Sequence, residues 1–98
     1  MSAKKNLTYI TGYFSGVTQP VSFENKAGRK CERSVVTLIT EDEQILYLEA
    51  REPVYKRIKK DLDLKGGELI EVGVVFVGSK KGDRHFNHMY INFIDYVN

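Results

Sequence analysis

The sequence of 98 residues is 42% hydrophobic and 29% charged, which suits one soluble domain, residues 1–98, and is too short for a second core. No apolar run reaches the roughly 18 to 20 residues of a membrane helix, and the first residues lack the apolar core of a secretion signal. The net charge is a modest +2, and Cys31 as the only cysteine excludes an intrachain disulfide, so a cytoplasmic protein is expected.

The first part of the chain alternates with a period of two, which is the period of a β-strand. Residues 1–6 precede this pattern and are expected to be flexible. Residues 7–17 are rich in β-branched and aromatic types and predict a strand that bends at Gly12 and Gly16. Residues 18–30 contain proline, asparagine and glycine and predict a loop.

A hairpin and a helix are predicted next. Residues 31–40 and 44–51 form two strands joined by a tight acidic turn at residues 41–43. Pro53 suits the first position of a helix that ends at Gly66–Gly67, and apolar side chains recur at helical spacing at Val54, Ile58 and Leu62. The other side of this helix carries cations that we interpret as a solvated face: Lys56, Arg57, Lys59 and Lys60.

Two further strands, residues 68–77 and 86–97, complete the chain, with a loop at residues 78–85 between them. The predicted order is three strands, a helix and two strands. A short amphipathic helix between the third and fourth of five strands is typical of the oligonucleotide-binding (OB) barrel, whose helix covers one open end. The predicted fold is therefore all-β, a five-stranded OB-type barrel with one short helix.

The apolar pattern also predicts which side chains fill the barrel. With an odd number of residues in the hairpin turn, the buried set is Val36, Leu38, Leu46, Leu48 and Ala50. The opposite register would bury Val35 and Ile39 instead, and the sequence leaves both registers open. In the last two strands, the side chains predicted to point inward are Ile70, Val72, Val74, Phe76, Met89, Ile91 and Phe93.

Basic residues gather in and beside the two predicted loops. One cluster is Lys26, Arg29, Lys30 and Arg33, and the other is Lys80, Lys81 and Arg84. Acids collect in the hairpin turn, so the molecule is expected to have a positive and a negative side. Charge alone leaves open the alternative that these are ordinary solvated loops.

Several aromatic side chains are predicted to lie outside the barrel near these cations: Tyr13, Tyr47, Phe86 and Tyr90. Exposed rings stack with unpaired bases, while basic loops follow the phosphates of a single strand. The alternative for any one tyrosine is a ring at the edge of the core with its hydroxyl in water. Nucleic-acid binding is therefore predicted from the whole set of rings, and no single tyrosine indicates it.

Motifs of catalysis and metal binding are missing from the sequence. It contains no phosphate-binding glycine loop and no GxSxG turn. His85 and His88 have a spacing that metal sites use, with Cys31 as a third ligand, but residues three apart on a strand face opposite sides. We therefore expect neither an enzyme nor a cofactor nor a bound metal.

The order of elements from Leu7 to Val97, including the last strand at residues 86–97, resembles the small OB-fold single-stranded-DNA-binding proteins of bacteria, phages and mobile elements. This resemblance implies a binding face formed by the second and third predicted strands together with the loops at residues 18–30 and 78–85. Those two loops hold the basic clusters, which were identified from charge alone.

Two features differ from the bacterial members of that group. The chain contains no tryptophan for stacking, and its last residues follow a strand directly, where those proteins have an acidic tail that recruits repair enzymes. These differences favour an accessory protein of DNA replication or repair, of phage or plasmid type, over a replication hub.

The sequence thus predicts sequence-nonspecific binding of single-stranded DNA, with RNA as a second candidate. The predicted phosphate contacts are Lys26, Arg29, Lys30, Arg33, Lys80, Lys81 and Arg84; the predicted stacking residues are Tyr13, Tyr47 and Phe86, with Arg51 as an auxiliary contact. The alternative is a protein-interaction module that docks a partner through the same face, including Ile39 and Ile45. The same apolar pair predicts a homodimer or higher oligomer.

Overall fold

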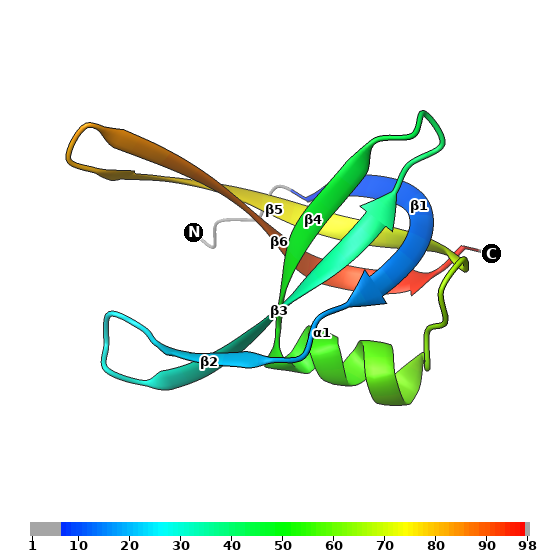
Figure 1. The fold of residues 1–98 in the computed structure, drawn as a ribbon, viewed down its shortest axis with the longest axis horizontal. Coiled ribbons are helices and arrows are strands. Elements are labelled where there is room, and N and C mark those ends of the chain that lie inside the picture. The colour runs from blue at the N-terminus through cyan, green and yellow to red at the C-terminus, as the bar shows by residue number, and fades with distance from the viewer. Residues whose placement is uncertain (1–6, 98) are drawn as a thin grey trace, which may run out of the picture.

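Six strands and one helical segment make up the structure, a computed structural model that describes residues 7–97 (Figure 1). The strands are β1 (Thr8–Val17), β2 (Val21–Glu24), β3 (Lys30–Ile39), β4 (Ile45–Arg51), β5 (Leu69–Lys81) and β6 (Arg84–Tyr96). Their order in the sheet is β1-β5-β6-β4-β3-β2, and a further pairing of β1 with β3 closes the ring. All five predicted strands are present, and the prediction for residues 1–6 lies outside the described residues.

Strand β1 closes the barrel because its two halves have different partners. Its first half pairs with β5 and its second half with β3. The pairing with β3 shifts register between Phe14 and Gly16. Gly16 has φ of 149°, a backbone conformation that would be strained in a residue with a side chain. At Gly12 a Cβ atom would lie 2.8 Å from the Ile39 carbonyl oxygen. The predicted irregularity at Gly16 is therefore confirmed as a bulge, whereas Gly12 lies in regular register and marks a close approach of two strands.

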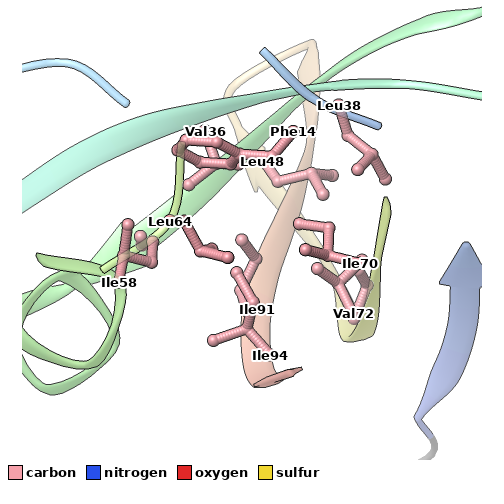
Figure 2. Packing of buried hydrophobic residues seen from close by; sticks show 12 residues of the cluster. Phe14, Val36, Leu38, Leu48, Ile58, Leu64, Ile70, Val72, Ile91 and Ile94 are labelled. Atoms are coloured by element: carbon pink, nitrogen blue, oxygen red, sulfur yellow. The ribbon is translucent and has the colours of Figure 1, made fainter. Parts of the chain in front are cut away.

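Alternate residues of β3 and β4 fill the barrel (Figure 2). Val36 pairs with Leu48, and Leu38 pairs with Leu46, across a turn of residues 40–44. The register predicted for an odd number of turn residues is thus confirmed. The complete buried core is Phe14, Val36, Leu38, Leu48, Ala50, Ile58, Leu64, Ile70, Val72, Val74, Ile91 and Ile94.

Two rings predicted to be in the core are not. Phe76 is 55% exposed, because it lies where β5 extends past the barrel, and every residue of β5 from Phe76 to Lys81 is exposed. Phe93 is 37% exposed, because β6 contains an extra residue, Asn92, between the partners of Val74 and Gly73. Such a bulge reverses the alternation, so that Ile94 points inward in place of Phe93.

The two segments predicted as loops are largely strand. Residues 21–24 form β2 and pair with residues 30–33 of β3, and the pairing of β5 with β6 continues to Lys81 and Arg84. Only Gly82 and Asp83 connect these last two strands, with Gly82 at φ of 63°. Figure 1 shows both hairpins projecting to the same side of the barrel, at the left. We call them the β2–β3 arm (residues 21–33) and the β5–β6 arm (residues 76–89).

The helix lies between β4 and β5, as predicted, and packs Ile58 against the core. It consists of α1 (Glu52–Lys56) and a π-helical turn, η1 (Arg57–Asp61). It ends at Asp61, earlier than the predicted end at Gly66–Gly67, because Asp63 adopts a left-handed conformation with φ of 48°. No helix within residues 7–97 has the length and apolar character needed to cross a membrane.

Candidate nucleic-acid interface

The outer face of β3 and β4 carries the side chains that alternate with the core residues. Tyr47 is 63% exposed on this face and lies opposite Thr37. Ile45 is exposed beside its partner Ile39, and Tyr13 of β1 pairs with Ile39 from the other side. The end of this face that is formed by Tyr13, Ile39, Ile45 and Tyr47 is therefore apolar and aromatic, and we call it the apolar end.

The centre of the same face is a row of planar side chains from three strands. The Arg51 guanidinium carbon lies 4.7 Å from the centre of the Phe23 ring and 5.2 Å from the centre of the Tyr90 ring. Tyr90 in turn stacks with His88 at 5.7 Å between ring centres and 20° between planes. We call Phe23, Arg51, Tyr90 and His88 the central row. Contacts between arginine and ring faces hold such groups in place through the cation–π interaction.

Glu49 lies beside the central row and contacts its cations. Its Oε1 atom is 3.5 Å from Arg33 Nη1 and 3.8 Å from His88 Nδ1, and its Oε2 atom is 3.6 Å from Arg51 Nη2. The Glu49 side chain is only 15% exposed, whereas Arg33 and Arg51 reach into solvent. The arginines at the centre of the face therefore already have an anionic neighbour.

A groove of about 500 Å³ runs along the edge of the central row. Arg51 and Tyr90 form one side of this groove, and Pro53 lies at the start of the helix. The remaining lining residues are Val54, Val75, Val77, Ile91 and Asn92. The groove offers apolar surface next to a tyrosine ring, a setting in which a planar ring can be buried.

The β5–β6 arm has two faces, and the register assigns each residue to one of them. Lys81 pairs with Arg84, and Ser79 pairs with Phe86. Arg84 and Phe86 precede His88 and Tyr90 on β6 at two-residue spacing, so all these side chains share the face of the central row. Lys80 pairs with His85 on the opposite face, together with Gly78, Asn87, Phe76 and Met89. The predicted pair Lys80 and Lys81 is therefore split between the two faces of the arm.

The β2–β3 arm carries its cations at the tip. Asn25 Oδ1 accepts hydrogen bonds from the backbone N–H groups of Ala27 and Arg29, each at 2.9 Å, which fixes the turn. Lys26 and Arg29 are exposed in this turn. Lys30 pairs with Glu24 on the face opposite to Phe23. Among the predicted phosphate contacts in this arm, Lys30 therefore points away from the central row.

Among the described residues, six cations of the arms lack the ion-pair partners that Lys56 and Arg57 have on the helix. None of Lys26, Arg29, Lys30, Lys80, Lys81 and Arg84 forms an ion pair with another of residues 7–97. On the helix, Lys56 lies 2.9 Å from Glu52, and this hydrogen bond raises the pKa of Lys56. Arg57 donates to the Ile94 carbonyl and contacts Asp95. The six arm cations are thus available for an external anion, as are Lys59 and Lys60 on the helix, which also form no ion pair with another of residues 7–97.

Most predicted site residues share one face. Arg33, Tyr47, Arg51, Phe86, Lys81 and Arg84 lie on the face of the central row, while Tyr13 lies at its far end. Sequence reasoning missed Phe23 and His88 as parts of this face, and it did not name Glu49 as a site residue, although strand alternation places Glu49 on the outer face beside Tyr47 and Arg51. The alternation of apolar and polar residues at 21–24 is the signal that could identify Phe23, and the two-residue spacing of His88 from Tyr90 could identify His88.

The histidines do not come together as a metal site. His85 and His88 lie on opposite faces of the β5–β6 arm, as the strand period predicts. Among the described residues, no group of three histidine, cysteine or acidic side chains is placed to hold a metal ion.

No protein-family model matches this chain, and no curated protein matches its sequence. Solved structures do match it. A crystal structure of the mitochondrial single-stranded DNA binding protein Rim1 from S. cerevisiae superposes with a TM-score of 0.62 at 7% sequence identity, covering 96% of this chain and 97% of Rim1. A second crystal form of Rim1 gives a TM-score of 0.56 at 11% identity, covering 97% of this chain and 96% of Rim1.

The chain has an OB fold. The match to Rim1 spans nearly all of both chains, so the likeness covers the barrel, the helix and both arms. The OB-type barrel predicted from the order of elements is therefore confirmed, as is the resemblance to small single-stranded-DNA-binding proteins. At 7% identity the likeness shows the fold alone, because one fold can serve many functions. The function depends on the side chains that this chain places on the fold.

Proposed function

We propose that this protein binds single-stranded nucleic acid, primarily DNA, without sequence preference and without catalysing a reaction. The observation that carries the proposal is the central row: Arg51 lies against the rings of Phe23 and Tyr90, between two arms with unpaired cations. This combination of stacking surface and flanking positive charge is what proteins use to bind an unpaired strand.

The central row and Tyr47 supply the base contacts in this proposal. Every base has a π-face, so stacking on an aromatic ring or a guanidinium plane tolerates any base sequence. Tyr47 is well exposed, and the groove beside Tyr90 adds apolar surface for a base that lies edge-on to the sheet. Phe86 continues the same face along the β5–β6 arm.

The arms supply the phosphate contacts. Lys81 and Arg84 at one tip and Lys26 and Arg29 at the other have no acidic partner among residues 7–97, so a phosphate would not have to displace one. Each phosphate that they neutralise releases condensed counterions, which makes binding sensitive to salt. Lys30 and Lys80 face away from the central row and contribute in this proposal through long-range attraction.

The known binding activity of a protein with the same fold supports the proposal. Rim1 is named as a single-stranded DNA binding protein, and its structure covers 96% of this chain. A cytoplasmic accessory protein of DNA replication or repair is the setting that we propose for this activity. Self-association through the exposed Ile45 and its half-buried partner Ile39 is a further part of the proposal.

A fluorescence titration tests the proposal directly. The protein is titrated against labelled oligo-dT and against a duplex of the same length, each at two salt concentrations. We expect tighter binding of the single strand, because the bases of a duplex are not free to stack, and weaker binding at the higher salt. Failure to bind oligo-dT or a mixed single strand at low salt would refute the proposal. The exposed face of Ile39, Ile45 and Tyr47 would then be better explained as a docking surface for a protein partner.

A further inference from the structure

Glu49 is an acidic residue at the centre of a face that we propose to bind an acidic polymer. Three cationic or titratable side chains surround its carboxylate: Arg33 at 3.5 Å, Arg51 at 3.6 Å and His88 at 3.8 Å. Its Oε2 atom is buried and has no hydrogen-bond partner among the described residues. A buried carboxylate oxygen is costly to maintain, so its position between the cations calls for an explanation.

The carboxylate of Glu49 lies beside Arg33 and Arg51, the two cations that could otherwise hold a phosphate at the centre of the face. Arg33 and Arg51 are the cations nearest to the rings of the central row, and both are directed toward Glu49. A phosphate placed between them would come within a few ångströms of the carboxylate and would be repelled by it. A neutral base meets no such repulsion, and it can stack on the guanidinium of Arg51 and on the rings beside it.

We propose that Glu49 determines which part of the strand this face accepts: it excludes phosphates from the centre and admits bases. The bound strand then lies with its bases on the central row and its phosphates toward the arms. Glu49 thereby disfavours ligands that offer only phosphates, such as duplex DNA and inorganic polyphosphate. This inference builds on the proposed function, but its test with a ligand that has no bases stands on its own.

The test compares Glu49→Gln with Glu41→Gln. Glutamine keeps the shape of the side chain, and its carbonyl oxygen can still accept a hydrogen bond from Arg33; the charge is removed, and an NH2 group replaces the oxygen that accepts no hydrogen bond. Glu41 is exposed in the β3–β4 turn, away from the central row, and its replacement changes the net charge by the same amount. Thermal unfolding followed by circular dichroism verifies that both variants fold, and Glu49→Thr, a good strand former, replaces Glu49→Gln if that variant does not.

Binding of inorganic polyphosphate is measured first. We expect Glu49→Gln to bind it more tightly than Glu41→Gln does, by a ratio about five-fold larger at 0.1 M than at 1 M salt, because one additional phosphate contact adds roughly 0.7 log units of affinity per tenfold decrease in salt. We also expect the affinity of Glu49→Gln for duplex DNA to rise more than its affinity for oligo-dT, so that the preference for the single strand decreases. Equal affinities of the two variants for polyphosphate, or weaker binding by Glu49→Gln, would overturn the inference.

The two proposals fail separately in these experiments. If the unmodified protein does not bind oligo-dT, the proposed function is wrong, while the polyphosphate comparison still reports on Glu49. If the unmodified protein binds oligo-dT and the two glutamine variants behave alike, the function stands and the role given to Glu49 is wrong.

Discussion

The centre of the proposed binding face and the tips of its two arms use positive charge in different ways. At the centre, Arg33 and Arg51 contact Glu49 and the rings of Phe23 and Tyr90. At the tips, Lys81, Arg84, Lys26 and Arg29 have no ion-pair partner among residues 7–97. The central cations lie over rings and beside a carboxylate, and the tip cations extend into solvent.

This difference separates two kinds of binding energy. A guanidinium held against a ring by a neighbouring carboxylate offers a planar surface for stacking and little net charge. A free lysine or arginine attracts phosphate through its charge, and that attraction weakens as salt is added. The centre should therefore contribute affinity that salt hardly changes, and the tips affinity that salt removes.

The largest effect is expected from removing both rings of the central row. Phe23→Ala combined with Tyr90→Ala should cost on the order of 2 to 6 kcal/mol of binding free energy for oligo-dT, at about 1 to 3 kcal/mol per stacked base. Tyr9→Ala combined with Phe93→Ala is the matched control, because these rings contact each other over Gly73 on the outside of β1, β5 and β6. Equal losses in the two double variants, measured by fluorescence titration, would show that the central row is not the stacking site.

A smaller effect is expected at the tip of the β5–β6 arm. The loss of affinity caused by Lys81→Ala combined with Arg84→Ala should be about 25-fold larger at 0.1 M salt than at 1 M salt. Two phosphate contacts at roughly 0.7 each give 1.4 log units per tenfold change in salt. Lys59→Ala combined with Lys60→Ala removes the same charge from the helix and serves as the control. If the helix variant loses as much affinity, only the overall charge matters and the arm has no special role.

The two neighbouring lysines of that arm should differ from each other. Lys81 shares the face of the central row and Lys80 does not, as their partners Arg84 and His85 indicate. Lys81→Ala should therefore reduce the salt dependence by about 0.7 units, and Lys80→Ala by clearly less. Salt titrations of the two single variants provide the measurement. A larger effect of Lys80 would mean that the strand runs along the other face of the arm.

The smallest effect on nucleic-acid binding is expected at the apolar end of the face. Ile45 is exposed beside Ile39, and Ile45→Lys should shift a homodimer or higher oligomer toward the monomer while changing the affinity per monomer little. Sedimentation velocity at tens of micromolar protein measures this shift. A strict monomer in the unmodified protein would remove self-association from the account.

The barrel could be predicted from sequence because each of its strands has one buried face. Leu48 and Val36 alternate with polar or exposed residues, and that period specifies both the strands and their register once the turn length is known. The end of the helix was less predictable, because it depends on a single left-handed residue, Asp63, and the glycines that follow gave a stronger signal.

The arms could not be predicted in the same way. Residues 21–24 have no buried face, and their alternation of Val21 and Phe23 with Ser22 and Glu24 is only four residues long and lies between Pro20 and Asn25. The segment from Gly78 to Lys81 has no buried face either and shows glycine and charged residues where a core strand shows apolar alternation. The bulge at Asn92 has no clear signal in the sequence either. It reverses the alternation of β6, so that Ile94 and not Phe93 lies in the core. Charge clusters located the arms correctly, but the face on which each cation lies required the register.

The most direct test of the difference between centre and tips is the salt dependence of oligo-dT binding, measured side by side for three proteins. These are the unmodified protein, the Phe23/Tyr90 double alanine variant and the Lys81/Arg84 double alanine variant. We predict that the ring variant binds more weakly with an unchanged log–log slope, and that the tip variant has a slope shallower by about 1.4 units. A ring variant whose slope falls as far as that of the tip variant, or a tip variant with the slope of the unmodified protein, would contradict this division of roles.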